Sequence, residues 1–149
     1  MLSTATACFT PPAIKVAILL AVMKAIDEGR FRLNDPLSVR NRFVSVVDGS
    51  PYRLNADSDG YPQLYKSIGR TARISALAES MIIWSSNLAT NLLLDFVGVD
   101  TAARYLEQAS VAGVHLRRGV EDTYEQGLNN ETTANGMVQL FDVLLLGSA

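Results

Sequence analysis

The sequence has very few residues of the kinds that build covalent or metal sites. Its 149 residues include one cysteine, Cys8, and one histidine, His115. A single cysteine excludes an intrachain disulfide, and a single histidine excludes a multi-histidine metal site. We therefore expect Cys8 to be an unreactive thiol and His115 to have no functional role. Neither a metal nor another cofactor is expected.

Long charged runs and long apolar runs are also missing. The net charge is −2 and no Lys/Arg block is interleaved with aromatic residues, so a nucleic-acid partner is not expected. The longest apolar stretch, residues 16–23, has only eight residues, too few to cross a bilayer, and no membrane partner is expected. Residues 1–9 lack the positive start of a signal peptide, so the cytoplasm is the default expectation.

What the sequence does contain is enough apolar material for one folded domain, with 48% hydrophobic residues. We expect residues 1–10 to be a flexible tail and residues 11–149 to form a single helical domain. Residues 12–28 predict its first helix, which is apolar nearly all round and should lie at the centre. Thr10 is a candidate cap for its start, and Gly29 should end it.

The predicted fold class is mainly α, with about five helices packed round that central helix. Further helices are expected at 74–83, at 87–96, at 100–110 with Asp100 as cap, and from Thr132 or Thr133 almost to the chain end. Residues 43–47 fit a short strand or a helical turn, and residues 113–131 a polar loop. The side chains expected to face inward are Ile74, Leu77, Ala78, Met81, Ile82, Ala103, Leu106, Ala109, Met137, Leu140, Phe141, Leu144 and Leu145.

The acidic stretch 57–60 has the sequence Asp-Ser-Asp-Gly, which resembles the start of a calcium loop. Such a loop is closed by a glutamate, and none stands at the required position. An ordinary turn is therefore expected at these residues.

Three polar clusters interrupt the helical pattern, and each has a structural interpretation beside a functional one. Lys15 lies inside an apolar helix, where the amine must be paired with other groups, be neutral or reach the solvent. Ser85-Ser86-Asn87 lies between two helices, where it could cap a helix or point into a cleft. The loop that contains Glu121, Glu125 and Asn129 could be a solvated acidic loop or hold a general base.

Taken together and in this order, the clusters resemble the serine β-lactamases of class A and related serine hydrolases. Their motif set is S-x-x-K, S-D-N and K-T-G, with a loop glutamate proposed as base. The similarity extends beyond the motifs, through residues 14–37, 81–93 and 127–134, and covers most of residues 9–146. It implies the all-α half of a two-domain fold.

The resemblance also assigns roles by position. It implies that Lys15 is the lysine of S-x-x-K, that Ser85 is the proton-relay serine of S-D-N, and that Asn87 is its substrate-binding asparagine. Ser86 replaces the aspartate of that motif. Glu121, three residues after Arg118, is the preferred match for the base, with Glu125 as the alternative.

Asn129 is the further substrate-binding residue that the resemblance implies, and a β-lactam-like small molecule is the implied ligand. Two departures stand against a working site. The nucleophile position, three residues before Lys15, holds Pro12. Proline has no hydroxyl to acylate and no N–H to help form an oxyanion hole. No K-T-G motif follows within the 149 residues, and the strands of the α/β half are missing.

Three functions are therefore open. The first is a truncated, catalytically impaired or inactive β-lactamase-like helical domain, a pseudoenzyme of the antibiotic-resistance family that would form a homodimer through an exposed apolar face. The second is an active or residual β-lactam or ester hydrolase with another nucleophile, such as Ser85, or a partner chain. The third is a binding module for a small ligand or protein. Family members are usually exported, which conflicts with the cytoplasmic default.

Overall fold

The computed structural model describes residues 11–111, 113–120 and 130–146. Thr10 and the expected N-terminal tail lie outside these residues. Five α-helices make up most of the described chain: α1 Pro11–Asp27, α2 Ile74–Ile83, α3 Asn87–Val97, α4 Val99–Gln108 and α5 Ala134–Leu146. The predicted mainly helical fold with about five helices is therefore confirmed.

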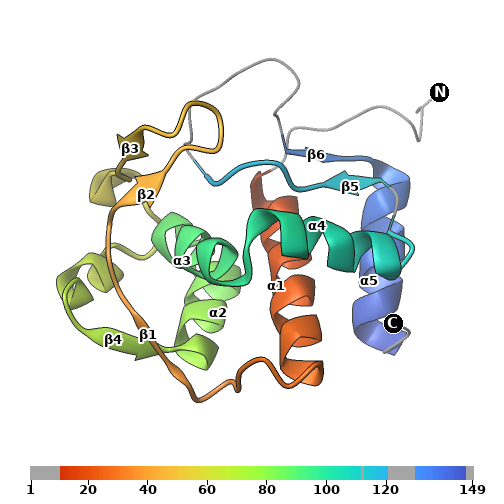
Figure 1. Ribbon diagram of the computed structural model, residues 1–149, viewed down its shortest axis with the longest axis horizontal. Coiled ribbons are helices and arrows are strands. Elements are labelled where there is room, and N and C mark those ends of the chain that lie inside the picture. The colour runs from red at the N-terminus through yellow and green to blue at the C-terminus, as the bar shows by residue number, and fades with distance from the viewer. Residues whose placement is uncertain (1–10, 112, 121–129, 147–149) are drawn as a thin grey trace.

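Helix α1 is the centre of the fold, as its sequence predicted. It packs against all four of the other α-helices, and in Figure 1 it lies between α2 and α3 on one side and α5 on the other. Ala17, Ile18, Ala21, Val22 and Ala25 along it are fully buried. Most sides of α1 are apolar because neighbouring helices cover most of them, while Met23 is 37% exposed. Gly29, in the left-handed region with φ 76°, follows its end.

The strands are short and form three two-stranded antiparallel sheets in the part of the chain that is described. These pair β1 Pro36–Ser38 with β4 Thr71–Arg73, β2 Phe43–Val44 with β3 Pro51–Tyr52, and β5 Val114–His115 with β6 Glu131–Thr132. Two 3₁₀ helices, η1 Ala56–Ser58 and η2 Pro62–Ser67, lie between β3 and β4. In the stretch 57–60, residues 57–58 end a short 3₁₀ helix, Asp59 is extended and Gly60 lies in a bend. Residues 43–44 are a strand.

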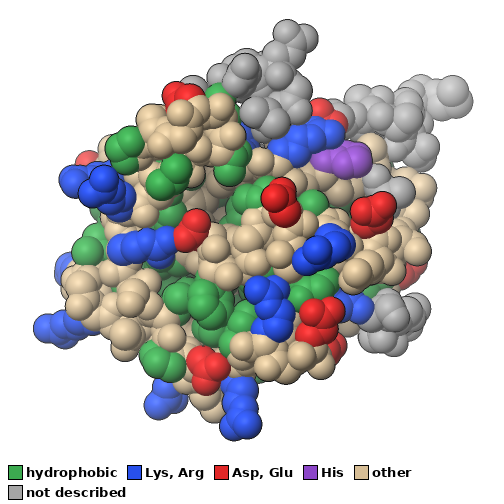
Figure 2. Space-filling model, viewed as in Figure 1, with side chains coloured by type: hydrophobic (Ala, Val, Ile, Leu, Met, Phe, Trp, Pro, Cys, Tyr) green, Lys and Arg blue, Asp and Glu red, His purple; other side chains and the backbone are tan. Residues whose placement is uncertain are grey.

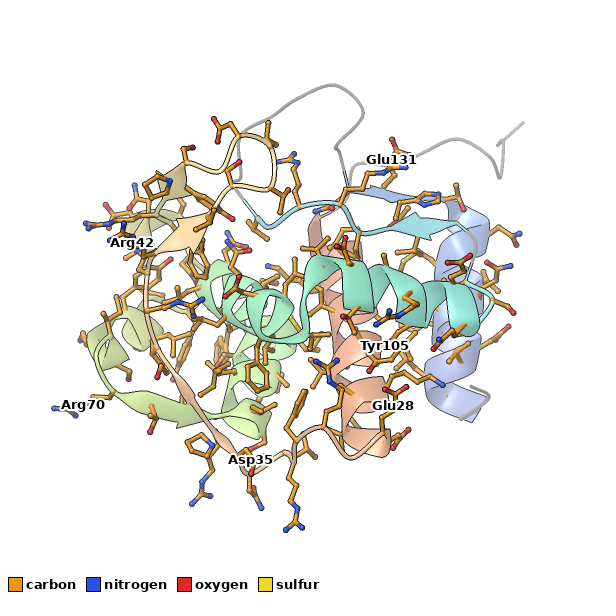
Figure 3. All side chains as sticks on the ribbon, in the orientation of Figure 1. Glu28, Asp35, Arg42, Arg70, Tyr105 and Glu131 are labelled. Carbon is orange, nitrogen blue, oxygen red and sulfur yellow. The ribbon has the colours of Figure 1, made fainter. Side chains whose placement is uncertain are left out.

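Polar contacts fix the ends of helices to one another. The hydroxyl of Tyr105, on α4, donates to Oε1 of Glu28 at 2.7 Å, just after the end of α1 (Figure 3). Arg30 in turn donates to the Tyr105 hydroxyl at 3.4 Å. These bonds hold α4 across α1 near the end of α1 that is remote from Lys15.

Several side chains face other directions than the sequence predicted. On α4, Ala102, Tyr105 and Leu106 are buried, while Ala103 and Ala109 are only half-buried. That helix begins at Val99 after Gly98, so Asp100 lies in its first turn and is not its cap. Ile82, expected in the core, is 40% exposed on α2. The other inward residues predicted on α2, Ile74, Leu77, Ala78 and Met81, are buried as expected, and so is Leu106 on α4. The differences arise because neighbouring helices decide which stripe is covered.

Helix α5 shows the largest difference. Leu140 and Val143 are buried against α1, and Met137 and Leu144 are partly buried, but Phe141 is 45% and Leu145 80% exposed. The helix begins at Ala134, and Thr132 lies in β6 instead. Thr133 precedes the helix and its hydroxyl accepts from the Gly136 N–H at 2.9 Å. The predicted single inward face is therefore two faces, one of them exposed.

The surface carries mixed charges. Figure 2 shows Lys, Arg, Asp and Glu side chains scattered over the face that α3 and α4 form, with no large area of one sign. Within the described ranges, no helix has both the length and the apolar character that a membrane span requires.

Candidate active site at Lys15

Lys15 is buried, with 4% of its surface exposed, at the beginning of the central helix. Its Nζ donates to the carbonyl oxygen of Ser85 at 2.7 Å and to Oδ1 of Asn87 at 3.0 Å. The structure therefore brings together three of the residues that the motifs singled out, although 70 residues separate Lys15 from Ser85. Lys15 does not extend to solvent, which was the structural alternative.

The α2–α3 turn, residues 84–86, shapes the other side of this site. Ser85 has φ 55°, in the left-handed region where a side chain is strained. Its side chain is exposed, whereas its carbonyl faces Lys15. Ser86 is fully buried and caps α3, because its hydroxyl accepts from the Ala89 N–H at 3.1 Å. The two serines thus have different roles: one is strained and exposed, and the other is a buried cap.

Asp59 is a buried carboxylate beside this turn that the sequence pattern did not single out as a site residue. It is 9% exposed, and its Oδ2 accepts from the backbone N–H of Leu88 at 2.9 Å. The sequence spacing alone could not predict that Asp59, just after η1, lies close to α3. The only local signal was an aspartate before Gly60 in a turn, which is common at the surface.

The charge on Lys15 is influenced by two opposing effects. Burial lowers the pKa of the Lys15 amine, and the carboxylate of Asp59 partly opposes this by raising it. A lowered pKa increases the fraction of neutral amine, which can accept a proton. A neutral amine still has two N–H donors, which match the two acceptors at Ser85 and Asn87.

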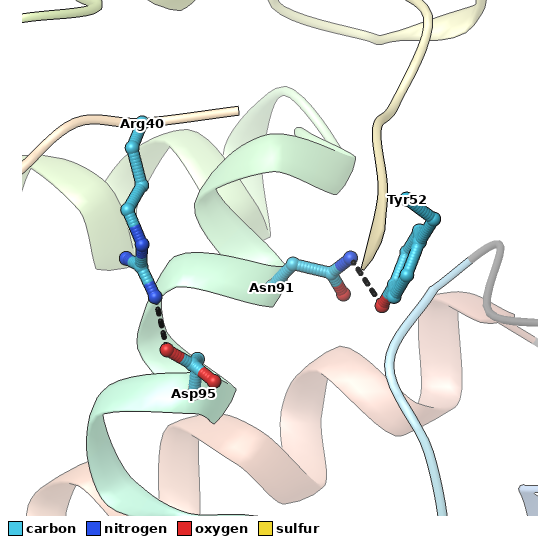
Figure 4. A network of polar contacts seen from close by, with 4 residues as sticks. All are labelled: Arg40, Tyr52, Asn91 and Asp95. Atoms are coloured by element: carbon cyan, nitrogen blue, oxygen red, sulfur yellow. Dashed lines mark hydrogen bonds and ion pairs between the residues drawn. The ribbon is translucent and has the colours of Figure 1, made fainter. Parts of the chain in front are cut away.

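Asn91 lies one turn after Asn87 on α3 and holds the loop that follows β5. Its Oδ1 accepts from the Val120 N–H at 2.7 Å, and its Nδ2 donates to the Val120 carbonyl at 3.0 Å. Nδ2 also lies 3.3 Å from the Tyr52 hydroxyl, and on the same helix Asp95 pairs with Arg40 (Figure 4). The spacing of four from Asn87 was the signal that could have identified Asn91.

Asn130 binds the described segment that precedes Val120. Its Oδ1 accepts from the backbone N–H groups of Arg117 and Arg118 at 2.7 and 3.0 Å, and its Nδ2 donates to the Arg118 carbonyl at 2.8 Å. Glu121, Glu125 and Asn129, the candidate base and substrate-binding residues, lie outside the described residues. Their roles therefore stay predictions.

Position 12 lies inside α1, one turn before Lys15. The backbone there is helical, as expected for the first turn of a helix that begins at Pro11. Among the described residues, no group of three or more His, Cys, Asp or Glu side chains is placed to hold a metal ion.

A central helix with a buried lysine, joined to a serine carbonyl and an asparagine amide at a helix–helix turn, defines the helical part of a serine β-lactamase-type fold. Residues 7–149 match the family model described as "Beta-lactamase enzyme family". The chain belongs to the beta-lactamase enzyme family. No match was found among curated protein sequences.

Solved structures share the fold at low sequence identity. A β-lactamase from Sphaerobacter thermophilus is 23% identical, with a TM-score of 0.72, over 92% of this chain and 48% of its own. A β-lactamase from Chitinophaga pinensis is 15% identical, with a TM-score of 0.75, over 98% of this chain and 52% of its own. A PBP-A variant, solved as an acyl-enzyme complex with penicillin G, is 22% identical, with a TM-score of 0.73, over 98% of this chain and 50% of its own. This chain thus spans about half the length of these relatives.

Proposed function

We propose that this chain is a β-lactamase-like domain that keeps the lysine, serine and asparagine arrangement of its family's site but does not turn over β-lactams. The observation that carries the proposal is the pair of hydrogen bonds from Lys15 Nζ to the Ser85 carbonyl and to Asn87 Oδ1. A buried lysine costs free energy unless its N–H groups are satisfied. Here its acceptors come from the α2–α3 junction that also bears the serine and asparagine of the motif.

The loss of turnover in this proposal comes from Pro12. Proline has no hydroxyl to form an acyl-enzyme, and no N–H to donate to an oxyanion. Removing the nucleophile of a serine hydrolase costs roughly six orders of magnitude in rate. Lys15, Ser85 and Asn87 are then left with binding and proton-holding roles for a β-lactam-like molecule.

Intact-mass spectrometry with penicillin G and with a chromogenic β-lactam tests this proposal. We expect no turnover and no covalent adduct on the natural chain, whereas either one would overturn it. An adduct that maps to Ser85 would instead identify the alternative hydrolase, with Ser85 as its nucleophile.

A second variant separates the proline from the rest of the site. Pro12→Ser should gain a covalent adduct at position 12, and Pro12→Ser combined with Lys15→Met should not gain it. Both variants should keep the helical circular dichroism of the natural chain. An unmodified Pro12→Ser protein would show that the lost serine alone does not explain the absence of acylation.

We also propose that the chain forms a homodimer through the α5 face, which consists of Val138, Phe141 and Leu145. These side chains are 58%, 45% and 80% exposed. Their spacing of three and four residues is that of a helix–helix seam, which suits pairing with an identical helix about a twofold axis. Light scattering at micromolar concentration should report a dimer, and a clean monomer would overturn this proposal.

A further inference from the structure

Only two charged side chains are buried in the part of the chain that the structure describes, Lys15 and Asp59. Both contact the same short segment around the α2–α3 turn: Lys15 binds the Ser85 carbonyl and Asn87, and Asp59 binds the Leu88 N–H. Buried charges are rare unless a specific arrangement retains them. Because both of them bind this one turn, we argue that the carboxylate belongs with the proposed site.

Three neutral donors satisfy Asp59. Its Oδ2 accepts from the Leu88 N–H at 2.9 Å and from the Tyr65 hydroxyl at 2.9 Å, and its Oδ1 accepts from the Tyr61 N–H at 2.8 Å. Leu88 lies in the first turn of α3, where free N–H groups and the helix dipole favour a negative charge. The carboxylate is thus oriented by three bonds and directed at the beginning of this helix.

The turn itself has no carboxylate. The motif S-D-N has aspartate at its middle position, and this chain has Ser86 there. The Ser86 hydroxyl accepts from the Ala89 N–H. The neighbouring Leu88 N–H is taken by Asp59, which is 29 residues earlier in the chain. Serine and aspartate therefore divide the capping of α3 between two separate segments.

The segment after Asp59 packs closely on the same turn. A Cβ placed on Gly60 would overlap the carbonyl oxygen of Trp84, so only glycine permits this approach. Tyr61 stacks on Trp84 with their ring centroids 6.0 Å apart. Residues 59–61 thus hold the α2–α3 turn by a hydrogen bond, a backbone contact and a ring contact.

We infer that Asp59 is a positioning residue, which supplies from a separate segment the carboxylate that the α2–α3 turn lacks and so holds Ser85 and Asn87 against Lys15. The inference rests on the assignment of Lys15, Ser85 and Asn87 to the proposed site. It does not require that the site turn over any substrate.

The charged groups around Lys15 support this inference. Among the described residues, Asp59 is the charged group whose carboxylate raises the pKa of the Lys15 amine, against the lowering by burial. Glu131, on the strand β6 that packs on α1, is paired with Arg117 at 3.3 Å. The other charged side chains on helices that pack on α1 are exposed to solvent: Glu79, Asp95, Asp100, Arg104, Glu107 and Asp142.

An NMR titration of the lysine side chains in Asp59→Asn tests the inference without any substrate, with Lys15→Met to assign the signal. We expect the pKa of the Lys15 amine to fall, because the opposing carboxylate charge is gone. We also expect hydrogen exchange at the Leu88 amide to accelerate about tenfold or more. Asp57→Asn, an exposed aspartate two residues away, is the matched control and should change neither quantity.

A rescue variant keeps the test decisive if Asp59→Asn does not fold. Ser86→Asp combined with Asp59→Asn returns a carboxylate to the middle of the turn, and it should restore folding and raise the pKa of Lys15 again. Two results would overturn the inference: an Asp59→Asn protein that matches the Asp57→Asn control, or a double variant that shows no rescue. Neither depends on β-lactam turnover, so the proposed inactivity can fail separately.

Discussion

The polar junction, formed by Lys15, Asp59, Ser85 and Asn87, differs from the α5 face in how it is covered. At the junction both charged groups are buried, and partners within this chain satisfy their hydrogen bonds. On the α5 face, apolar side chains are exposed, and an open groove of about 420 Å³ lies between α1 and other residues of α5. The described residues therefore satisfy the buried charged groups of the polar junction by themselves, whereas they leave the α5 face uncovered.

This difference shows that the geometry of the polar junction and the exposure of the α5 face depend on separate parts of the fold. The junction is held by α1, the α2–α3 turn and the segment 59–61, all within residues 11–97. The α5 face belongs to the last helix. Substitutions in one region should leave the other unchanged, since separated sites that share no partners act additively.

The largest effect is expected at the junction, from Asp59→Ala. The substitution removes the acceptor of the Leu88 and Tyr61 N–H groups and of the Tyr65 hydroxyl. It should lower the free energy of unfolding by about 3–5 kcal/mol, because buried donors lose a charged partner. Urea denaturation measures this loss. The control Asp57→Ala should stay within about 0.5 kcal/mol, and equal effects of the two would contradict the role given to Asp59.

A smaller loss is expected from Gly60→Ala. The added Cβ overlaps the Trp84 carbonyl oxygen, so the backbone of the turn or of segment 59–61 must move. Overpacking of this kind costs about 1–3 kcal/mol, again measured by urea denaturation. Ser58→Ala, at an exposed neighbouring position, is the control. A Gly60→Ala protein as stable as this control would show that segment 59–61 does not need its close approach to the turn.

Ser85→Gly should act in the opposite direction. With φ 55°, Ser85 is strained by about 1–2 kcal/mol, which glycine relieves at an entropic cost of about 0.5–1 kcal/mol. The expected gain in the free energy of unfolding is therefore between about 0 and 1.5 kcal/mol. Ser80→Gly, inside α2, should instead lose about 0.5–1 kcal/mol. If both variants lost stability equally, the positive φ of Ser85 would not be a source of strain.

The smallest effect on stability is expected on the α5 face, from Leu145→Lys. Because Leu145 is 80% exposed, its replacement should change the free energy of unfolding by less than about 0.5 kcal/mol. Light scattering should nevertheless show the dimer dissociating, since a charge would enter the apolar seam. Val44→Lys, 64% exposed on β2, is the control that should remain dimeric. A Leu145→Lys dimer would contradict the use of this face.

The sequence predicted the parts of the fold that depend on local chemistry. The apolar content of residues 12–28 was sufficient to identify the central helix, and α2 and α3 begin at Ile74 and Asn87 as their patterns indicated. The motif order also identified Lys15, Ser85 and Asn87, which the fold brings together. On α4 and α5 the sequence predicted the burial of Leu106 and Leu140 but missed Ala102, Tyr105 and Val143, because periodicity gives the buried stripe only approximately and the neighbouring helix fixes it.

By itself, the sequence determined the helical class and the central position of α1, and it singled out the lysine, serine and asparagine of the proposed site. Only the tertiary structure placed Asp59 and Asn91 beside them. Asp59 reaches α3 across 29 residues and Asn91 reaches Val120 across the same separation, and no local pattern encodes such distances. The physical reason is that a buried polar group must find its partner wherever the packed helices place one.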